Sequence, residues 1–277
     1  MRPEDISFAI QITDQENWSI PLQDFQRILR LDPRGSFIAT EGKRRIGLAT
    51  TASYGRKIAW IGNVVVKKQY RGKHVGQLLV TNAVNYLHEK RVKHVALYCF
   101  DENVEFYKNL GFLKGTRFGR MRRELHPISE EPRKFDSYRS LALPEILTLD
   151  EKAFGADRSS VILDLLRSKA ASVLSVARGQ ARSYLLTKDY EDMYELGPWT
   201  SVQVSRPALE YLLSQSLARA NRKAVEVSAP LRNVQAIAML RRNDFRITKT
   251  GRSMFLDEIP RIGSPATILA LGFLDKG

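Results

Sequence analysis

The residues with the clearest chemical potential lie in a short turn between an apolar stretch and an amphipathic stretch. The segment reads Val64-Val65-Val66-Lys67-Lys68-Gln69-Tyr70-Arg71-Gly72-Lys73-His74-Val75-Gly76-Gln77-Leu78-Leu79. Glycine lets the main chain come close to a ligand, and the unpaired N–H groups and dipole at a helix start attract negative charge. Arg71 and Lys73 add full positive charges. The segment therefore predicts a cradle for a phosphate or pyrophosphate group.

The elements around this turn are predicted from hydrophobic periodicity. The region Val75–Glu89 has a helical apolar stripe, and it follows a strand at Lys57–Lys67. The other elements expected in the first half are strands at Ile6–Ile12, Ser36–Glu41, Arg45–Ser53 and His94–Cys99, helices at Trp18–Leu31 and Glu102–Leu110, and a final strand pair within Phe112–Arg122.

A second set of elements follows a charged, proline-containing region at Pro127–Asp136. Such composition is typical of a linker. We therefore predict a first domain at residues 1–126, a linker at 127–137 and a second domain at 138–277. The second domain is expected to hold helices at Leu143–Phe154, Arg158–Ser168, Pro207–Ala220 and Asn233–Arg242, and strands at Ser172–Ala177, Ala181–Thr187, Glu195–Val204, Ala224–Ser228, Ile247–Leu256 and Thr267–Phe273.

The two halves repeat weakly, which favours duplication of one ancestral domain. A tryptophan strand opens both series, at Trp60 and at Trp199. A phenylalanine precedes a methionine by nine residues in each half, at 112 and 121 and again at 245 and 254. The fold class predicted is α/β, in the form of two tandem domains that each have a central mixed sheet flanked by helices.

Composition narrows the possible partners and compartments. The 277 residues carry a net charge of +14 and a single cysteine, Cys99, so no intrachain disulfide forms. No apolar run reaches the roughly 18 residues of a membrane span, and the first residues lack a signal peptide's apolar core. These features predict a cytoplasmic protein without a membrane partner. Residues 1–126 hold 22 basic and 12 acidic residues, a net of +10, which suits a polyanionic ligand.

These residues resemble the GNAT superfamily of acetyl-coenzyme A-dependent N-acyltransferases. The superfamily signature is Gln/Arg-x-x-Gly-x-Gly/Ala between a strand and a helix. Arg71 and Gly76 match it, whereas His74 stands where the first glycine is usual. A second signature places an aromatic-Tyr pair before Gly-Phe, as in Phe106-Tyr107-Lys108-Asn109-Leu110-Gly111-Phe112. The wider pattern is similar to the tandem YitH-like acetyltransferases, which join a catalytic GNAT domain to a degenerate one.

The resemblance implies an enzyme that uses acetyl-CoA as co-substrate, needs no metal and transfers the acetyl group directly to an amine. It implies a bulge that leaves main-chain groups near Val64–Val66 free for the pantetheine arm. It also implies that the Tyr107 phenol is the general acid that protonates the leaving thiolate. The residues expected to bind the coenzyme are Val64, Val65, Val66, Arg71, Gly72, Lys73, His74, Val75, Gly76, Gln77 and Tyr107.

The second half departs from the signatures. Ser205-Arg206-Pro207 replaces the glycine cradle, and proline lacks an N–H donor. Leu240 stands where Tyr107 stands in the first half. We therefore expect neither coenzyme binding nor catalysis in the second domain.

Several roles stay open in the sequence. The sequence does not identify the base that deprotonates the amine. It is either water or one of the acidic residues near the last helix of the first domain, which are Asp101, Glu102 and Glu105. Cys99 is a small core residue or an acyl carrier, and Trp18, Trp60 and Trp199 belong to the core or to an acceptor pocket. The acceptor is expected to be a small-molecule amine of unknown identity, and the chain a monomer or homodimer. A non-catalytic acyl-CoA-binding module is the alternative function, and a basic nucleic-acid- or ribosome-associated protein ranks last because no recognition motif is present.

Overall fold

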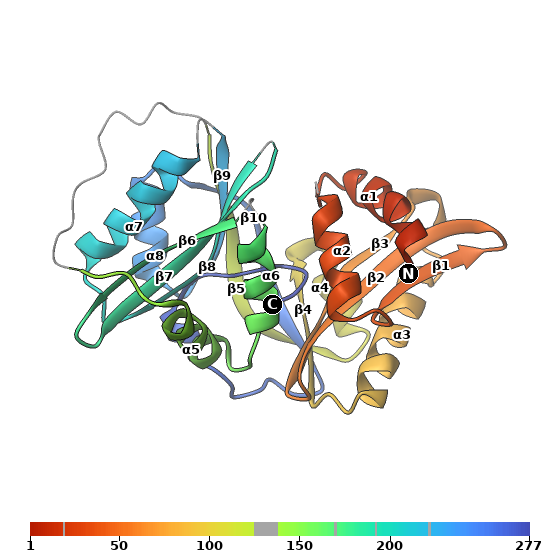
Figure 1. The fold of residues 1–277 in the computed structure, drawn as a ribbon. Helices are drawn as coiled ribbons and strands as arrows, with labels where there is room; N and C mark the ends of the chain where they lie inside the picture. The colour runs from red at the N-terminus through yellow and green to blue at the C-terminus, as the bar shows by residue number, and fades with distance from the viewer. Residues whose placement is uncertain (19, 125–137, 169–170, 192, 221–222) are drawn as a thin grey trace. The chain divides into compact units, whose positions relative to one another are not determined.

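The computed structural model describes the chain except residues 19, 125–137, 169–170, 192 and 221–222 (Figure 1). The chain forms two compact units that are not continuous in sequence. The first comprises Met1–Gly115, Ser253–Pro260 and Leu274–Gly277, and the second comprises Thr116–Arg252 and Arg261–Phe273. Each unit has strands and helices around its own core, so the predicted mixed α/β fold is confirmed.

The first unit is built on a sheet in the order β1-β2-β3-β4, followed by parts of β10 and β5. The pairs β1–β2 and β2–β3 are antiparallel, and β3–β4 is parallel. Its elements are α1 (Ile6–Asp14), α2 (Leu22–Leu31), β1 (Ser36–Glu41), β2 (Arg44–Tyr54), β3 (Ile58–Val66), α3 (Val75–Glu89), β4 (His94–Phe100) and α4 (Val104–Lys108), with short 3-10 turns at Pro3–Asp5, Lys68–Tyr70 and Asp101–Asn103.

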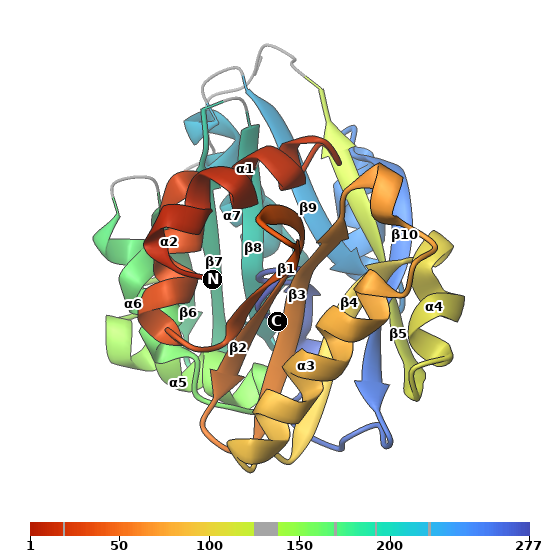
Figure 2. The same cartoon turned by 90° about the vertical axis from the view of Figure 1, so that its right-hand side faces the viewer.

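Helices of the first unit cover both faces of its sheet, and Figure 2 shows α1, α2 and α3 around strands β1–β3. Leu48 packs with the helices α1 and α2, whereas its neighbour Ala49 packs with Leu79 of α3. Successive residues of a strand point to opposite faces, so α3 lies on the face opposite α1 and α2. The helix predicted at Val75–Glu89 is confirmed with the same bounds.

The strand predicted at Ile6–Ile12 is wrong, because these residues belong to helix α1. Phe8, Ile10 and Ile12 recur at every second position, a spacing that also fits a strand. The residues that the structure buries also include Ala9 and Thr13, which complete a helical spacing. A short apolar run does not separate the two periods by itself, and packing of α1 on α2 and Leu48 decides in favour of the helix.

The second unit repeats this plan, with β6–β7 and β7–β8 antiparallel and β8–β9 parallel. Its sheet runs from β6 through β7, β8 and β9 to parts of β5 and β10. Of the strand predicted at Thr267–Phe273, only Ile268–Ala270 forms a strand. The elements are α5 (Leu143–Phe154), α6 (Ser159–Arg167), β6 (Ala171–Arg178), β7 (Ala181–Asp189), β8 (Met193–Val202), α7 (Arg206–Arg219), β9 (Ala224–Pro230), α8 (Val234–Arg242) and β11 (Ile268–Ala270), with a 3-10 turn at Pro265–Thr267.

Two long strands, β5 (Phe112–Arg123) and β10 (Arg246–Leu256), each contribute to both units. The strand pair predicted within Phe112–Arg122 is therefore wrong, since these residues form one continuous strand. Gly115 makes no turn. A Cβ built there would lie 2.7 Å from the ring of Phe255. The glycine therefore allows β10 to pack closely against β5.

The expected domain boundaries are only partly open to comparison. The predicted linker at 127–137 lies outside the described residues. Residues 138–277 were assigned to one domain, but Ser253–Pro260 and Leu274–Gly277 pack within the first unit. Among the described residues, no helix has the length and apolar character to span a bilayer.

Candidate functional site

The turn before α3 has the open geometry expected of an anion cradle. Gly72 has a φ of +75°, and a Cβ placed on it would meet nothing within 4 Å. Helix α3 begins at Val75, and no side chain caps its first turn in the described chain. The first N–H groups of a helix have no intrahelical partner. The N–H groups at the start of α3 are thus suited to an anionic ligand.

His74 takes the left-handed conformation at the N-cap of α3, with a φ of +57°. This region is unfavourable for most residues other than glycine, which explains why glycine is usual at this position of the signature. The imidazole is exposed, and its Nδ1 lies 3.1 Å from Oε1 of Gln77. The side chain is therefore held against the first turn of α3, at the edge of the cradle.

The two cations of the cradle have different surroundings. Nε of Arg71 donates to the carbonyl oxygen of Val66 over 2.9 Å, and its Nη2 pairs with Glu16. Arg71 thus fastens the cradle to the end of β3. Lys73 lies over the ring of Tyr70, with Nζ 5.4 Å from the ring centroid.

Strand β3 leaves β4 just before the cradle. The parallel pairing ends at Ile61 and Leu97, while pairing with β2 continues to Val66. Asn63 and Val64 stand opposite the single residue Ala49 of β2, which is a β-bulge, and Asn63 has a φ of +52°. The bulge expected near Val64–Val66 is present. It turns the main chain of these residues away from the β4 ladder.

Tyr107 lies on α4 and is buried, with its ring edge-on to Phe106 and Phe112 at 4.9 and 6.0 Å. Burial first, and then the nearby Cys99 thiol, raise the pKa of the Tyr107 phenol above its ordinary value. The phenol therefore keeps its proton throughout the neutral range. Tyr107 and Cys99 share one core cluster, against which Val64 packs.

Three predicted segments meet at Gly76. A Cβ built there would lie 3.4 Å from Cζ of Phe106 on α4 and 3.8 Å from Cγ2 of Val66 on β3. The start of α3, the residue beside Tyr107 and the bulged end of β3 therefore converge at one place. Two predicted binding residues, Gly76 and Val66, therefore lie next to Phe106, the neighbour of Tyr107.

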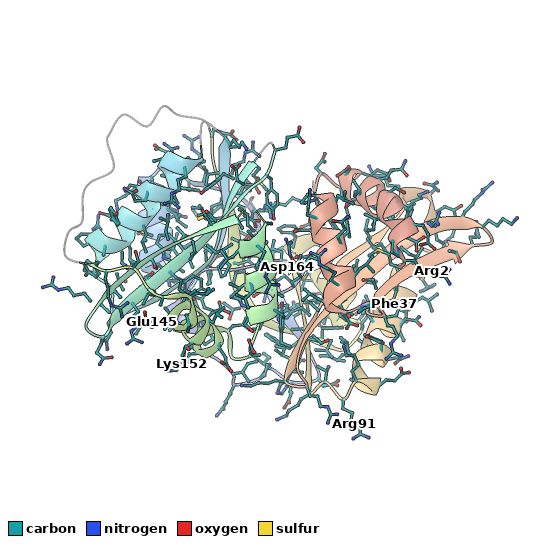
Figure 3. All side chains as sticks on the ribbon, viewed as in Figure 1. Arg2, Phe37, Arg91, Glu145, Lys152 and Asp164 are labelled. Atoms are coloured by element: carbon teal, nitrogen blue, oxygen red, sulfur yellow. The ribbon has the colours of Figure 1, made fainter. Side chains whose placement is uncertain are left out.

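The acidic candidates for a base are less favourably placed. Glu105 is 65% exposed, and its carboxylate pairs with Lys114 at 3.1 Å and Lys108 at 3.2 Å. Hydrogen bonds from these two lysines lower the pKa of Glu105, which weakens it as a base. Asp101 and Glu102 lie exposed in a 3-10 turn. Figure 3 shows the side chains on the ribbon.

Cys99 and the three tryptophans take structural positions. Sγ of the buried Cys99 lies 3.4 Å from Sδ of Met254. Trp60 stacks on Tyr98 at 4.3 Å, and Trp18 packs against the cluster of α1 and α2. Trp199 is buried in the second unit, where its Nε1 donates to Oγ of Ser183. Trp60 is the tryptophan that lies on β3 near the bulge.

Sequence reasoning missed Asn63. The signal for it was a polar residue inside an otherwise apolar strand, between Gly62 and Val64. Its amide donates to Oγ1 of Thr50 at 3.0 Å and to Oδ2 of Asp275 at 3.3 Å. No pattern in the sequence pointed to Asp275, which is 212 residues away.

A basic groove of about 700 Å³ lies beside the cradle in the first unit. Arg44, Arg45 and Lys67 line it, and no acidic residue is among its lining residues. Arg45 pairs with Asp5 at 2.6 Å, while Lys67 lies over the ring of Phe8. The groove adds positive potential next to the cradle.

The corresponding turn of the second unit offers fewer main-chain donors to an anion. Helix α7 begins with Arg206 and Pro207, so one N–H donor is missing from its first turn. Leu240 is buried in the core of that unit. Within the described residues, no group of three or more His, Cys, Asp or Glu side chains has the geometry of a metal site.

Two family models match the chain. One, described as the acetyltransferase (GNAT) family, matches residues 6–112, and the other, described as an acetyltransferase (GNAT) domain, matches residues 146–264. Together they cover most of the chain, and they confirm the expected tandem arrangement.

Individual relatives and structures agree with these matches. Histone acetyltransferase TAP1 of Glycine max is 35% identical over 72 residues, which are 26% of this chain and 31% of that protein. The chain spans less than a third of the plant relatives that it matches first. Holothin acyltransferase of Pseudoalteromonas sp. (strain SANK 73390) is 22% identical over 264 residues, covering 95% of this chain and 88% of that protein. A putative acetyltransferase from Pyrococcus horikoshii has a TM-score of 0.81 at 20% identity, covering 100% and 94% of the two chains.

Proposed function

Because the chain belongs to the GNAT acetyltransferase family, we propose that its first unit is an N-acetyltransferase acting on a primary amine by direct transfer. The observation that carries this proposal is the convergence of the open α3 start, the bulged end of β3 and Tyr107. Enzymes of the family use acetyl-CoA, which supplies the acetyl group as a reactive thioester. No metal takes part in the proposed reaction.

The coenzyme is proposed to bind along the first unit through main-chain groups. The N–H groups of Arg71–Gly76 and Gln77 would hold the pyrophosphate, supported by the helix dipole of α3. Gly72 leaves room for the phosphates, since a Cβ there meets nothing within 4 Å. The main chain of Val64–Val66, turned out of the β4 ladder, would pair with the pantetheine arm.

Tyr107 is proposed to act as the general acid. Its phenol carries a proton at neutral pH, as any phenol with a pKa of about 10 does, and burial raises that pKa further. In the reaction, the acceptor nitrogen loses a proton, a C–N bond forms, the C–S bond breaks, and Tyr107 Oη donates its proton to the leaving sulfur. Water would accept the amine proton, and the Tyr107 phenolate would regain a proton from water, so that no net proton is gained or lost.

The amine's own proton has no assigned acceptor in the first unit. Glu105 is a poor candidate because two lysines hold its carboxylate. Water is the alternative acceptor, and it needs no dedicated side chain.

The acceptor class is open between small molecules and proteins. The names of the relatives include a histone acetyltransferase and a holothin acyltransferase. These names describe both a protein acceptor and a small-molecule acceptor, so an amine screen must include both.

Two measurements test the proposal in order. Calorimetry with acetyl-CoA should show binding at one site per chain, and absence of binding would contradict the coenzyme site. Thiol release should then rise when an accepted amine is added. Binding without thiol release for any amine in the screen would instead support the acyl-CoA-binding module.

A further inference from the structure

The segment Leu274–Gly277 belongs to the first unit and lies against its strands β2 and β3. The hydroxyl of Tyr54 donates to the carbonyl oxygen of Lys276. A Cβ built on Gly62 would lie 2.7 Å from Cα of Asp275. Gly62 is therefore required for this approach, because any larger residue would push the segment away from β3.

The segment Leu274–Gly277 also contacts the bulge of β3, through Asp275. Asn63, the bulge residue with φ +52°, is only 7% exposed. Its side-chain NH2 group has two donor hydrogens. One donates to Oγ1 of Thr50 on β2, at 3.0 Å, and the other to Oδ2 of Asp275, at 3.3 Å. The side chain is thus held from two sides, by the neighbouring strand and by the segment.

Asp275 is itself anchored. Its carboxylate pairs with the ammonium group of Lys276, which is only 1% exposed. The same ammonium lies 4.0 Å from the carboxylate of Asp24 on α2. Lys276 and Asn63 donate to the same carboxylate oxygen, Oδ2, so Asp275 links the bulge residue to a buried ammonium group.

A left-handed backbone costs energy at residues with a Cβ, although less at asparagine than at most, and the surroundings help to maintain it. At Asn63 those surroundings are Thr50 and Asp275. We infer that Asp275 is a positioning residue that acts through Asn63 to fix the β3 bulge, and with it the main chain of Val64–Val66, which lies outside the β4 ladder. This inference rests on the proposed function, because the bulge is where the coenzyme arm is proposed to pair.

The test compares Asp275→Ala with Asp275→Asn and with a matched control. The asparagine variant keeps an oxygen that accepts from Asn63, so it should rescue the function that alanine loses. Asp5→Ala is the control, since it removes another partly buried, ion-paired aspartate of the first unit away from the bulge. We expect thiol release by Asp275→Ala to fall about tenfold in kcat, with KM for acetyl-CoA changed less than threefold. Asp275→Asn and Asp5→Ala should stay within threefold of the unchanged protein.

Hydrogen exchange gives a readout that does not need an acceptor. In Asp275→Ala, the amides of residues 63–66 should exchange about tenfold faster, while those of Ile58–Ile61 should not change. If no amine supports thiol release by the unchanged protein, the proposed function fails and the exchange data alone decide the inference.

Two results would overturn the positioning role. One is unchanged kcat and unchanged exchange at residues 63–66 in Asp275→Ala. The other is an equal loss in Asp275→Ala, Asp275→Asn and Asp5→Ala, which would show a general loss of stability. Should Asp275→Ala fail to fold, Asn63→Gly replaces it. Glycine accepts the positive φ but lacks the anchoring amide, so the same tenfold loss in kcat is expected, and full activity would refute the inference.

Discussion

Each unit has a pair of parallel strands that separate at a bulge, β3 and β4 in the first and β8 and β9 in the second. The paired residues are Ile58–Ile61 with His94–Leu97, and Met193–Leu196 with Ala224–Val227. In the second unit, Leu186 of β7 faces the bulge, as Ala49 of β2 does in the first. The two units therefore share the geometry that opens a gap between strands.

Among the described residues, a strand enters the gap of the second unit but not that of the first. In the second unit, β11 pairs with Trp199 and Thr200 of β8, and the N–H of Leu271 donates to the carbonyl oxygen of Ser228 on β9. In the first unit, no strand of the described chain pairs with Val64–Val66 on the β4 side. Main-chain polar groups need partners. In the second unit β11 and Leu271 supply them. In the first, Arg71 donates to the carbonyl oxygen of Val66, and we propose that the coenzyme arm pairs with other main-chain groups of the segment.

The largest expected effect comes from giving the first unit the helix start of the second. Gly76 is the second residue of α3, as Pro207 is of α7. Gly76→Pro removes one N–H donor and crowds Phe106, while proline remains acceptable in a first helical turn. We expect acetyl-CoA affinity to fall about 30-fold, which corresponds to about 2 kcal/mol for a lost hydrogen bond to a charged group.

Calorimetry measures this affinity, and the melting temperature shows whether folding is affected. Pro207→Gly in the second unit is the control and should leave the affinity unchanged. Equal loss in both variants would show that the two helix starts do not differ in function.

The next largest effect is expected at Tyr107, whose place in the second half is taken by Leu240. Tyr107→Phe should lower kcat for thiol release at least tenfold, a size typical for loss of a general acid, with little change in acetyl-CoA binding. Tyr86→Phe is the control, because its hydroxyl donates to Asp32 elsewhere in the same unit. Unchanged turnover of Tyr107→Phe would exclude it as the acid.

A smaller effect is expected at His74. His74→Gly should raise the free energy of unfolding by about 1 kcal/mol, because glycine adopts the left-handed conformation without strain. Chemical denaturation measures this difference. Acetyl-CoA affinity should stay equal or increase, as expected for a side chain that crowds the phosphates. A tenfold loss of affinity would show instead that the imidazole holds the anion.

The smallest effect concerns pH and involves His94 of the first unit. Burial lowers its pKa, and this outweighs the opposing charge of Glu258. The unfolded chain therefore takes up a proton at higher pH than the folded one. Stability should fall as the pH drops through the ordinary histidine value, about 6.5.

Denaturation midpoints at pH 7.5 and 5.5 test this dependence. The decrease in stability between pH 7.5 and pH 5.5 should be smaller in His94→Gln than in the unchanged protein. An identical loss in both would assign the acid sensitivity to other groups.

Much of the candidate site could be predicted because it is encoded by neighbouring residues. The turn from Arg71 to Gly76, helix α3 and the spacing of Tyr107 to Phe112 are local features, each readable within about 15 residues. Asn63 could not be assigned a role, since its partner Asp275 is distant in sequence. Helix α1 was read as a strand because both periods fit so short a run.

The sequence by itself determined two tandem domains, with a glycine-containing turn before the helix in the first and Ser205-Arg206-Pro207 at the matching place in the second. It also revealed the matched pairs Phe112–Met121 and Phe245–Met254, but the structure divides both pairs between units. Phe112 and Met254 pack in the core of the first unit, and Met121 and Phe245 in that of the second.

Only the tertiary structure decided this exchange of strand ends, the filling of one gap by β11 and the approach of Asp275 to Asn63. The physical reason is common to all three. A strand's side-chain pattern specifies which face is buried. Its main-chain donors and acceptors are the same for every residue except proline, so they do not specify which strand pairs with it.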